Sequence, residues 1–158
     1  MKLWIGVFSA VALVGASSSA LAQQENELTR LGEALAFYGE MGRATEGLYP
    51  YFREERVYLS VQGPCPETAI EQDGADLALH ASDYRGGLLY YGFDSEALLV
   101  GWVEDWSDEP ACYAVMTGAD VVEALGGVSR EAYLVMNIET APVLLAPADF
   151  AAIAEMRD

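Results

Sequence analysis

The apolar residues of this chain recur with helical spacing near its two ends. Within residues 27–41, leucines and aromatic residues lie three or four positions apart, which predicts an amphipathic helix. Within residues 147–157, Phe150 and Ile153 have the same spacing, and Pro147 suits the first position of a helix. We therefore expect one helix at each end of the folded region.

Between these helices, alternating apolar and polar residues predict the strands of a sheet. Val57, Leu59 and Val61 share one face of the first strand, and the polar residues between them are expected to meet water. The segments 87–93 and 97–106 are apolar on both faces, which predicts central strands covered on both sides. The three polar residues between them are interpreted as the turn of a β-meander. The predicted strands are 57–62, 75–81, 87–93, 97–106, 111–116, 132–138 and 143–146.

These elements predict an α+β fold: a mainly antiparallel sheet of five or six strands, packed by the N-terminal and the C-terminal helix. The main variant is a mixed sheet. It arises because Thr117 is a good N-cap for a short helix over 118–125, which would make a parallel crossover between the flanking strands. Pro50 predicts a bend at Tyr49, followed by at most one helical turn over 50–54.

The first 22 residues have the pattern of a cleaved secretory signal peptide. Lys2 is followed by an apolar core of about fourteen residues, too short to span a bilayer, and then by small residues up to Ala22. We expect cleavage after Ala22, which leaves residues 23–158 as a single soluble domain with no membrane span. The expected location is secreted or periplasmic.

The charge of the chain excludes some partners. The formal net charge of −17 becomes −18 when Lys2, the only lysine, leaves with the signal peptide. Nucleic acid is excluded as a partner because binding a polyphosphate needs a basic face, and an anionic membrane surface is disfavoured for the same reason. The acidic, lysine-free composition fits adaptation to salt and a biased genome composition equally well.

Cys65 and Cys112 are the only cysteines, and an oxidising compartment favours a disulfide between them. The bond would close a loop of about 48 residues, worth roughly 4 kcal/mol in the chain-entropy model. No metal site is expected, because there is no Cys-x-x-Cys and only one histidine. No cofactor motif is present either, and Gly126-Gly127 is interpreted as the end of a helix.

Candidate catalytic groups are few. His80 is followed by Ser82 and Asp83, so a Ser/His/Asp site is conceivable, but an exposed strand histidine is the favoured interpretation. The acidic residues offer many carboxylate pairs for hydrolysis, with no means of choosing one. We therefore assign no catalytic residue, and a small secreted hydrolase using carboxylates or His80 stays as an alternative.

The best candidate for binding is an acidic segment around a tryptophan. It consists of Glu104, Asp105, Trp106, Asp108 and Glu109. An aromatic side chain among carboxylates suits a basic partner protein or a cationic ligand, because the ring supplies buried area and the acids supply electrostatic steering. A solvated acidic turn is the plainer interpretation, and Ca²⁺ is disfavoured because the EF-hand spacing is absent.

Two further possibilities concern the sheet. Aromatic residues on the predicted strands are interpreted as core, with a ligand platform as the alternative; they are Tyr90, Tyr91, Trp102 and Tyr113. The apolar faces of the central strands also leave open a structural or dimerising envelope module, with a homodimer as its form. The leading hypothesis remains an exported, non-catalytic binding protein.

Overall fold

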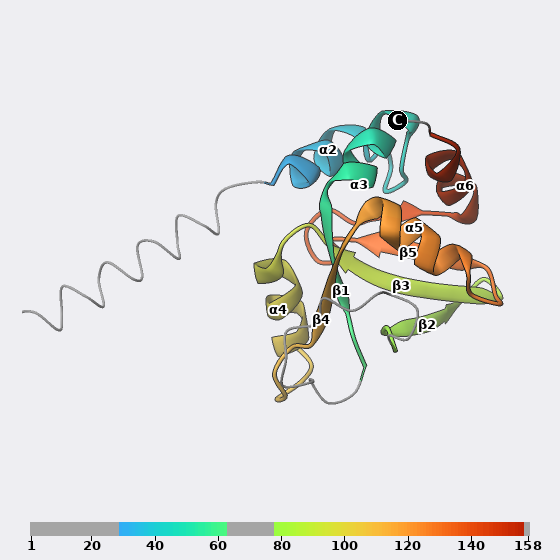
Figure 1. Ribbon diagram of the computed structural model, residues 1–158. Coiled ribbons are helices and arrows are strands. Elements are labelled where there is room, and N and C mark those ends of the chain that lie inside the picture. The colour runs from blue at the N-terminus through green and yellow to red at the C-terminus, as the bar shows by residue number, and fades with distance from the viewer. Residues whose placement is uncertain (1–28, 63–77, 157–158) are drawn as a thin grey trace, which may run out of the picture.

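The computed structural model describes residues 29–62 and 78–156 and has an α+β fold, as predicted (Figure 1). A six-stranded mixed sheet is packed by five helices. The helices are α2 (Arg30–Tyr38), α3 (Tyr49–Glu54), α4 (Glu96–Glu104), α5 (Gly118–Gly126) and α6 (Pro147–Glu155), with a 3-10 turn η1 (Glu46–Leu48) before α3. The strands are β1 (Arg56–Ser60), β2 (Ala81–Tyr84), β3 (Gly87–Phe93), β4 (Tyr113–Thr117), β5 (Ala132–Met136) and β6 (Val143–Leu145).

Strand β3 is the centre of the sheet. The strand order is β4-β1-β3-β5-β6, and β2 also pairs with β3. One edge of β3 pairs with β5 in parallel, whereas its other edge is shared between β2, opposite Gly87–Tyr90, and β1, opposite Gly92 and Phe93. The remaining pairs are antiparallel, so β4 and β5 run in the same direction on either side of β1 and β3. The crossover predicted through α5 is therefore confirmed, and it makes the sheet mixed.

Four helices cover one face of the sheet. Figure 1 shows α2, α3, α5 and α6 on this side. Val57 and Leu59 of β1 point into the core beneath these helices together with Phe52, Leu134 and Met136, and all five are almost completely buried. The alternation in the first predicted strand is confirmed for this face. Burial of such side chains supplies about 1.5–3 kcal/mol each before the cost of ordering the chain is counted.

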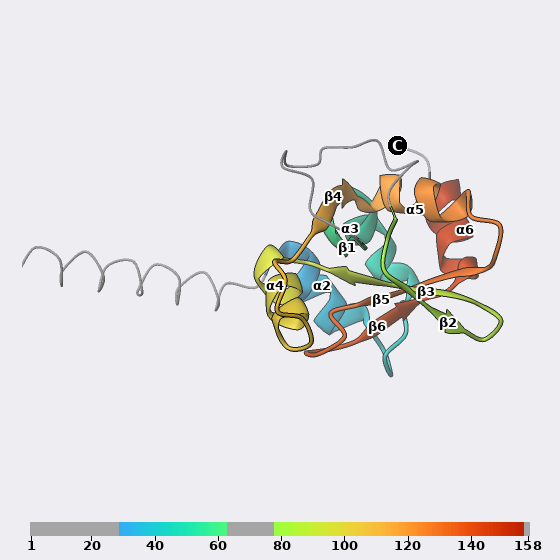
Figure 2. The same ribbon diagram turned by 90° about the horizontal axis from the view of Figure 1, so that it is seen from below.

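The opposite face is covered by α4, which corrects two expectations. Segment 97–106 is not a strand: α4 spans Glu96–Glu104 and packs on β1 and β3. Phe93, Leu99 and Val103 form the buried cluster between them. Because α4 lies over this face, Ser60 is 2% exposed rather than in contact with water. Figure 2 shows α4 and α6 at opposite sides of the molecule.

The physical reason for the helix lies in its first turn and its spacing. Ser95 has an extended backbone, and its side chain accepts a hydrogen bond from the Leu98 N–H, which makes it an N-cap. Leu99 and Val103 are four residues apart and so share a buried helical face. The polar residues after β3 therefore begin a helix instead of turning a meander.

The remaining elements largely follow the sequence. Thr117 caps α5 by accepting a hydrogen bond from the Asp120 N–H, as predicted. Tyr49 was expected at a bend, but it is the first residue of α3, with Pro50 in the first turn, where a missing N–H is harmless. The predicted strand 75–81 is replaced by a bridge at Leu79 and by β2, which starts at Ala81; residues 75–77 lie outside the described residues.

The edge strand β6 has a neighbour that the sequence did not predict. After α2, a turn through Met41 and Gly42, both with positive φ, brings Arg43 beside Leu144 in a parallel bridge. The Leu144 N–H donates to the Gly42 carbonyl at 2.8 Å, and the Ala44 N–H donates to the Leu144 carbonyl at 3.0 Å. The outer edge of β6 is therefore partly paired.

Some predictions cannot be compared with this fold. The predicted signal peptide, residues 1–22, and Cys65 lie outside the described residues. Cys112 is buried, and its disulfide with Cys65 stays a prediction. In residues 29–62 and 78–156, no helix has the length and apolar character needed to cross a bilayer.

Candidate functional site

The predicted acidic segment lies at the C-terminal end of α4, next to a cluster of aromatic rings. Trp102 and Trp106 are one helical turn apart, and their rings meet at 5.4 Å between centroids with an angle of 67°. Beneath them, Tyr91 of β3 stacks on Trp102 at 5.0 Å and Phe93 lies 5.4 Å from it. The cluster thus runs from the sheet through Trp102 to Trp106.

His80 contacts this cluster and lies at the point where the chain stops pairing with β1 and begins to pair with β3. Its N–H donates to the Ser60 carbonyl at 2.9 Å, so residue 80 still pairs with the β1 side, while β2 begins at the next residue and pairs with β3. Its imidazole ring meets Trp106 at 5.4 Å and 80°, and Trp102 at 6.5 Å and 87°. The His80 Nδ1 lies 2.7 Å from the Ser60 Oγ. Burial lowers the pKa of His80 below its usual 6.5, which keeps the ring neutral at pH 7.

Trp106 is the exposed end of the cluster. It is 52% exposed although Trp102 and His80 contact it, so its ring is supported on the protein side and open to solvent elsewhere. An aromatic ring held in this way can bury area on a partner at little cost in side-chain entropy. The structure therefore leaves Trp106 available for contact.

The acidic residues around Trp106 are also exposed. Glu104, Asp105, Asp108 and Glu109 all lie at the surface, and the Glu109 N–H donates to the Ser107 Oγ at 3.1 Å within the turn. In the described part of the chain, no ion pair joins these four acids to an arginine. The ion pairs found there are Arg30–Glu55 and Arg130–Asp83, on other elements. Within residues 29–62 and 78–156, the negative charge around Trp106 is thus not compensated by an ion pair.

Glu139 extends this surface, although no pattern in the sequence marks it. The loop after β5 packs Ile138 against the aromatic cluster, and the Glu139 carboxyl lies beside that of Asp105. Local desolvation and the charge of Asp105 raise the pKa of Glu139 above its usual range. We call the set Glu104, Asp105, Trp106, Asp108, Glu109 and Glu139 the Trp106 surface.

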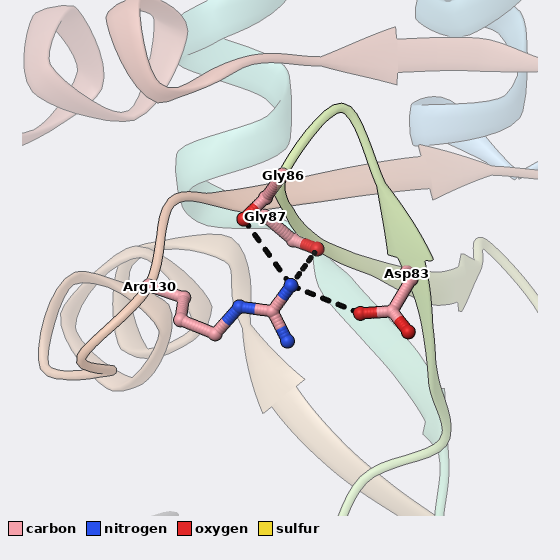
Figure 3. Close-up of polar contacts among 4 residues, drawn as sticks. All are labelled: Asp83, Gly86, Gly87 and Arg130. Carbon is pink, nitrogen blue, oxygen red and sulfur yellow. Dashed lines mark hydrogen bonds and ion pairs between the residues drawn. The ribbon is translucent and has the colours of Figure 1, made fainter.

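A Ser/His/Asp site is not assembled around His80. The Ser82 hydroxyl pairs with the Tyr91 hydroxyl at 2.8 Å. Asp83 pairs with Arg130, whose Nη2 donates to its carboxylate at 2.9 Å (Figure 3). The serine that does contact His80 is Ser60, which is buried and therefore out of reach of a substrate. The residues considered for catalysis thus have separate partners.

Figure 3 also gives Arg130 a structural role. The same Nη2 donates to the Gly86 and Gly87 carbonyls at 3.2 and 3.0 Å. Arg85 and Gly86, both with positive φ, form the two-residue turn between β2 and β3. Arg130 therefore fastens this hairpin to the segment before β5.

The four aromatic residues considered as a ligand platform divide between the two faces of the sheet. Tyr90 is buried beneath the four-helix layer, whereas Tyr91 and Trp102 belong to the cluster under α4. The Tyr113 hydroxyl donates to Glu96, and this hydrogen bond, with burial, raises the pKa of Tyr113 to about 12. They do not form a single platform.

Within the described ranges, no group of three or more His, Cys, Asp or Glu side chains is arranged to hold a metal ion. Comparison of the chain with protein-family models, with curated proteins and with solved structures finds no match. The geometry and charge of the Trp106 surface are therefore the basis for assigning a function.

Proposed function

We propose that this chain is an exported, non-catalytic binding protein that captures a basic partner protein through the Trp106 surface. The observation that carries the proposal is the 52% exposure of Trp106 at the end of a packed aromatic cluster, surrounded by acids with no arginine paired to them in the described residues. Many protein interfaces have large aromatic side chains at the centre and charges at the rim, and in them a few residues carry most of the binding energy.

The charge of the whole chain supports the same partner. With a formal net charge of −17, and −18 after removal of the predicted signal peptide, the protein attracts basic proteins over several ångströms and repels acidic ones. The four exposed acids at the end of α4 concentrate that charge beside Trp106. Such steering raises the association rate and weakens as salt shortens the Debye length to about 8 Å at 0.15 M.

The test is a quantitative pull-down from an envelope extract with three forms of the protein: wild type, Trp106→Ala and Phe37→Ala. Phe37 is a matched control because it is an exposed aromatic residue, 78% accessible, on a different helix. We expect basic proteins that are retained at low salt, released at high salt, retained by Phe37→Ala and lost with Trp106→Ala. Each captured protein is then purified and titrated against the same three forms. Binding that is indifferent to salt and to Trp106→Ala refutes the proposed surface.

A further inference from the structure

The arrangement of rings at the Trp106 surface restricts which cation it can hold. An aromatic cage for a quaternary ammonium group needs several rings standing apart around an empty centre. Here His80 and Trp102 contact Trp106 directly, with centroids 5.4 Å away in both cases and ring angles of 80° and 67°. No ligand fits between rings that already touch, so the accessible part of the cluster is the solvent side of the Trp106 indole.

A single open indole face suits a flat cation. The guanidinium group of arginine is planar and weakly hydrated, and it stacks on an aromatic face, whereas the ammonium group of lysine is a compact, strongly hydrated charge. His80 adds no competing positive charge to this cluster at pH 7, because its ring is neutral. The aromatic part of the surface therefore favours arginine.

The carboxyl groups next to Trp106 favour the same side chain. Asp105 precedes Trp106 in the chain, and Glu139 reaches Asp105 from the loop whose Ile138 packs on the cluster. Two carboxyls held together repel each other until a proton or a cation lies between them. A guanidinium has five N–H donors in a fixed fork and can bond to both carboxyls at once, which an ammonium does with less defined geometry.

We propose that the Trp106 surface recognises an arginine side chain of its partner, which stacks on the exposed indole of Trp106 and donates hydrogen bonds to Asp105 and Glu139. The inference builds on the proposed function, since it names the side chain that the basic partner presents. It assigns Glu139 as the residue that distinguishes arginine from lysine, and Trp106 as the residue that both would need.

The experiment uses three peptides of equal length and charge that carry arginine, lysine or trimethyllysine at one position and neutral residues elsewhere. Each is titrated calorimetrically into the wild type and into Trp106→Ala, Glu139→Gln and Glu155→Gln. Glu155 is a matched control, an exposed glutamate at the end of α6. We expect the arginine peptide to bind the wild type about five- to tenfold more tightly than the other two. This preference is kept in Glu155→Gln, falls to about twofold or less in Glu139→Gln, and disappears with all binding in Trp106→Ala.

The outcomes separate the inference from the proposed function. Equal binding of the arginine and lysine peptides, lost in Trp106→Ala, overturns the arginine assignment and leaves a basic partner at this surface. Tighter binding of the trimethyllysine peptide also overturns it, since a cage would then exist. An arginine preference that is unchanged in Glu139→Gln overturns the assignment of Glu139 as the residue that distinguishes arginine from lysine. Binding that is unaffected by Trp106→Ala, or absent for all three peptides, refutes the inference, and the pull-down alone then decides the proposed function. Circular dichroism of each variant checks that it is folded.

Discussion

Helix α5 begins so close to the end of α3 that residue 118 has no room for a side chain. A Cβ at Gly118 would lie 1.7 Å from the Phe52 carbonyl oxygen, whereas real Cβ atoms essentially never come within 3.0 Å of such a neighbour. The Gly118 N–H also donates to the Glu55 carbonyl at 3.1 Å, so the two backbones are joined at this point. Gly118→Ala therefore forces α5 and α3 apart by more than 1 Å or distorts both.

The size of the effect follows from what must move. Overpacking a buried site costs typically about 1–3 kcal/mol, and the upper end applies here because the obstacle is a backbone carbonyl rather than a flexible side chain. The alanine recovers less than about 1 kcal/mol of backbone entropy. We expect the free energy of unfolding to fall by about 2–3 kcal/mol, the overpacking cost less this recovered entropy. The melting temperature should fall by roughly 10 °C, since each kcal/mol shifts it by about 4 °C in a domain of this size.

The control for this change is Gly101→Ala, which lies inside α4. A Cβ at residue 101 meets no atom within 4 Å, so the substitution adds no clash. It should raise the free energy of unfolding by about 0.5–1 kcal/mol, because alanine favours a helix interior over glycine. Both variants and the wild type are unfolded in urea and followed by far-UV circular dichroism. The three curves are fitted with one shared m-value, the slope of the free energy of unfolding against urea concentration.

A Gly118→Ala variant that is as stable as the wild type, or more stable, would contradict this expectation. That result would mean that α5 and α3 are not in backbone contact. A loss of stability in Gly101→Ala would contradict a different part of the structure, the helical conformation of α4 and the open space beside residue 101.

Three further predictions concern single contacts. Ser95→Ala should cost about 1 kcal/mol in urea unfolding through loss of the α4 cap, and a cost near zero would contradict the helix start. Tyr49→Phe should cost about 1 kcal/mol, because it removes a 2.6 Å hydrogen bond to Asp149 that, after desolvation, helps raise the pKa of Tyr49 to about 12; a Tyr49→Phe variant as stable as wild type would exclude that bond. The single histidine, His80, should give one NMR titration with a pKa below 6.5. Since the unfolded chain then takes up the proton first, the His80 contribution to stability is complete above pH 6.5 and is lost as pH falls through the folded pKa; a value above 6.5 would reverse that sign.

Most of the fold could be predicted because its elements carry local signals. The cap at Thr117, the alternation of Val57 and Leu59 and the proline that begins α6 each correspond to an element in the structure. The strand predicted over 97–106 is wrong because this segment is a short apolar run. Periodicity alone does not separate a buried strand from a helix over nine or ten residues. Ser95 was the deciding signal, and it was interpreted as part of a turn.

The candidate site could be predicted only where it is continuous in the sequence. Residues 104–109 lie together in the chain, so their acidic and aromatic character is visible without a structure. His80, just before β2, and Glu139, in the loop after β5, join them through packing on Trp102, Trp106 and Ile138. Contacts between residues so far apart leave no trace in local spacing, which is why a sequence pattern could not identify them.

The bridge between Arg43 and Leu144 has a consequence for the behaviour of the protein in concentrated solution. An unpaired edge strand offers its N–H and C=O groups to any other chain and is a common starting point for aggregation. At β6, the outward groups of Leu144 are already bonded to Gly42 and Ala44, and Pro142 precedes the strand without a donor of its own. The turn after α2 thus covers this edge at Leu144, and its two hydrogen bonds oppose the pairing of β6 with a strand of a second molecule.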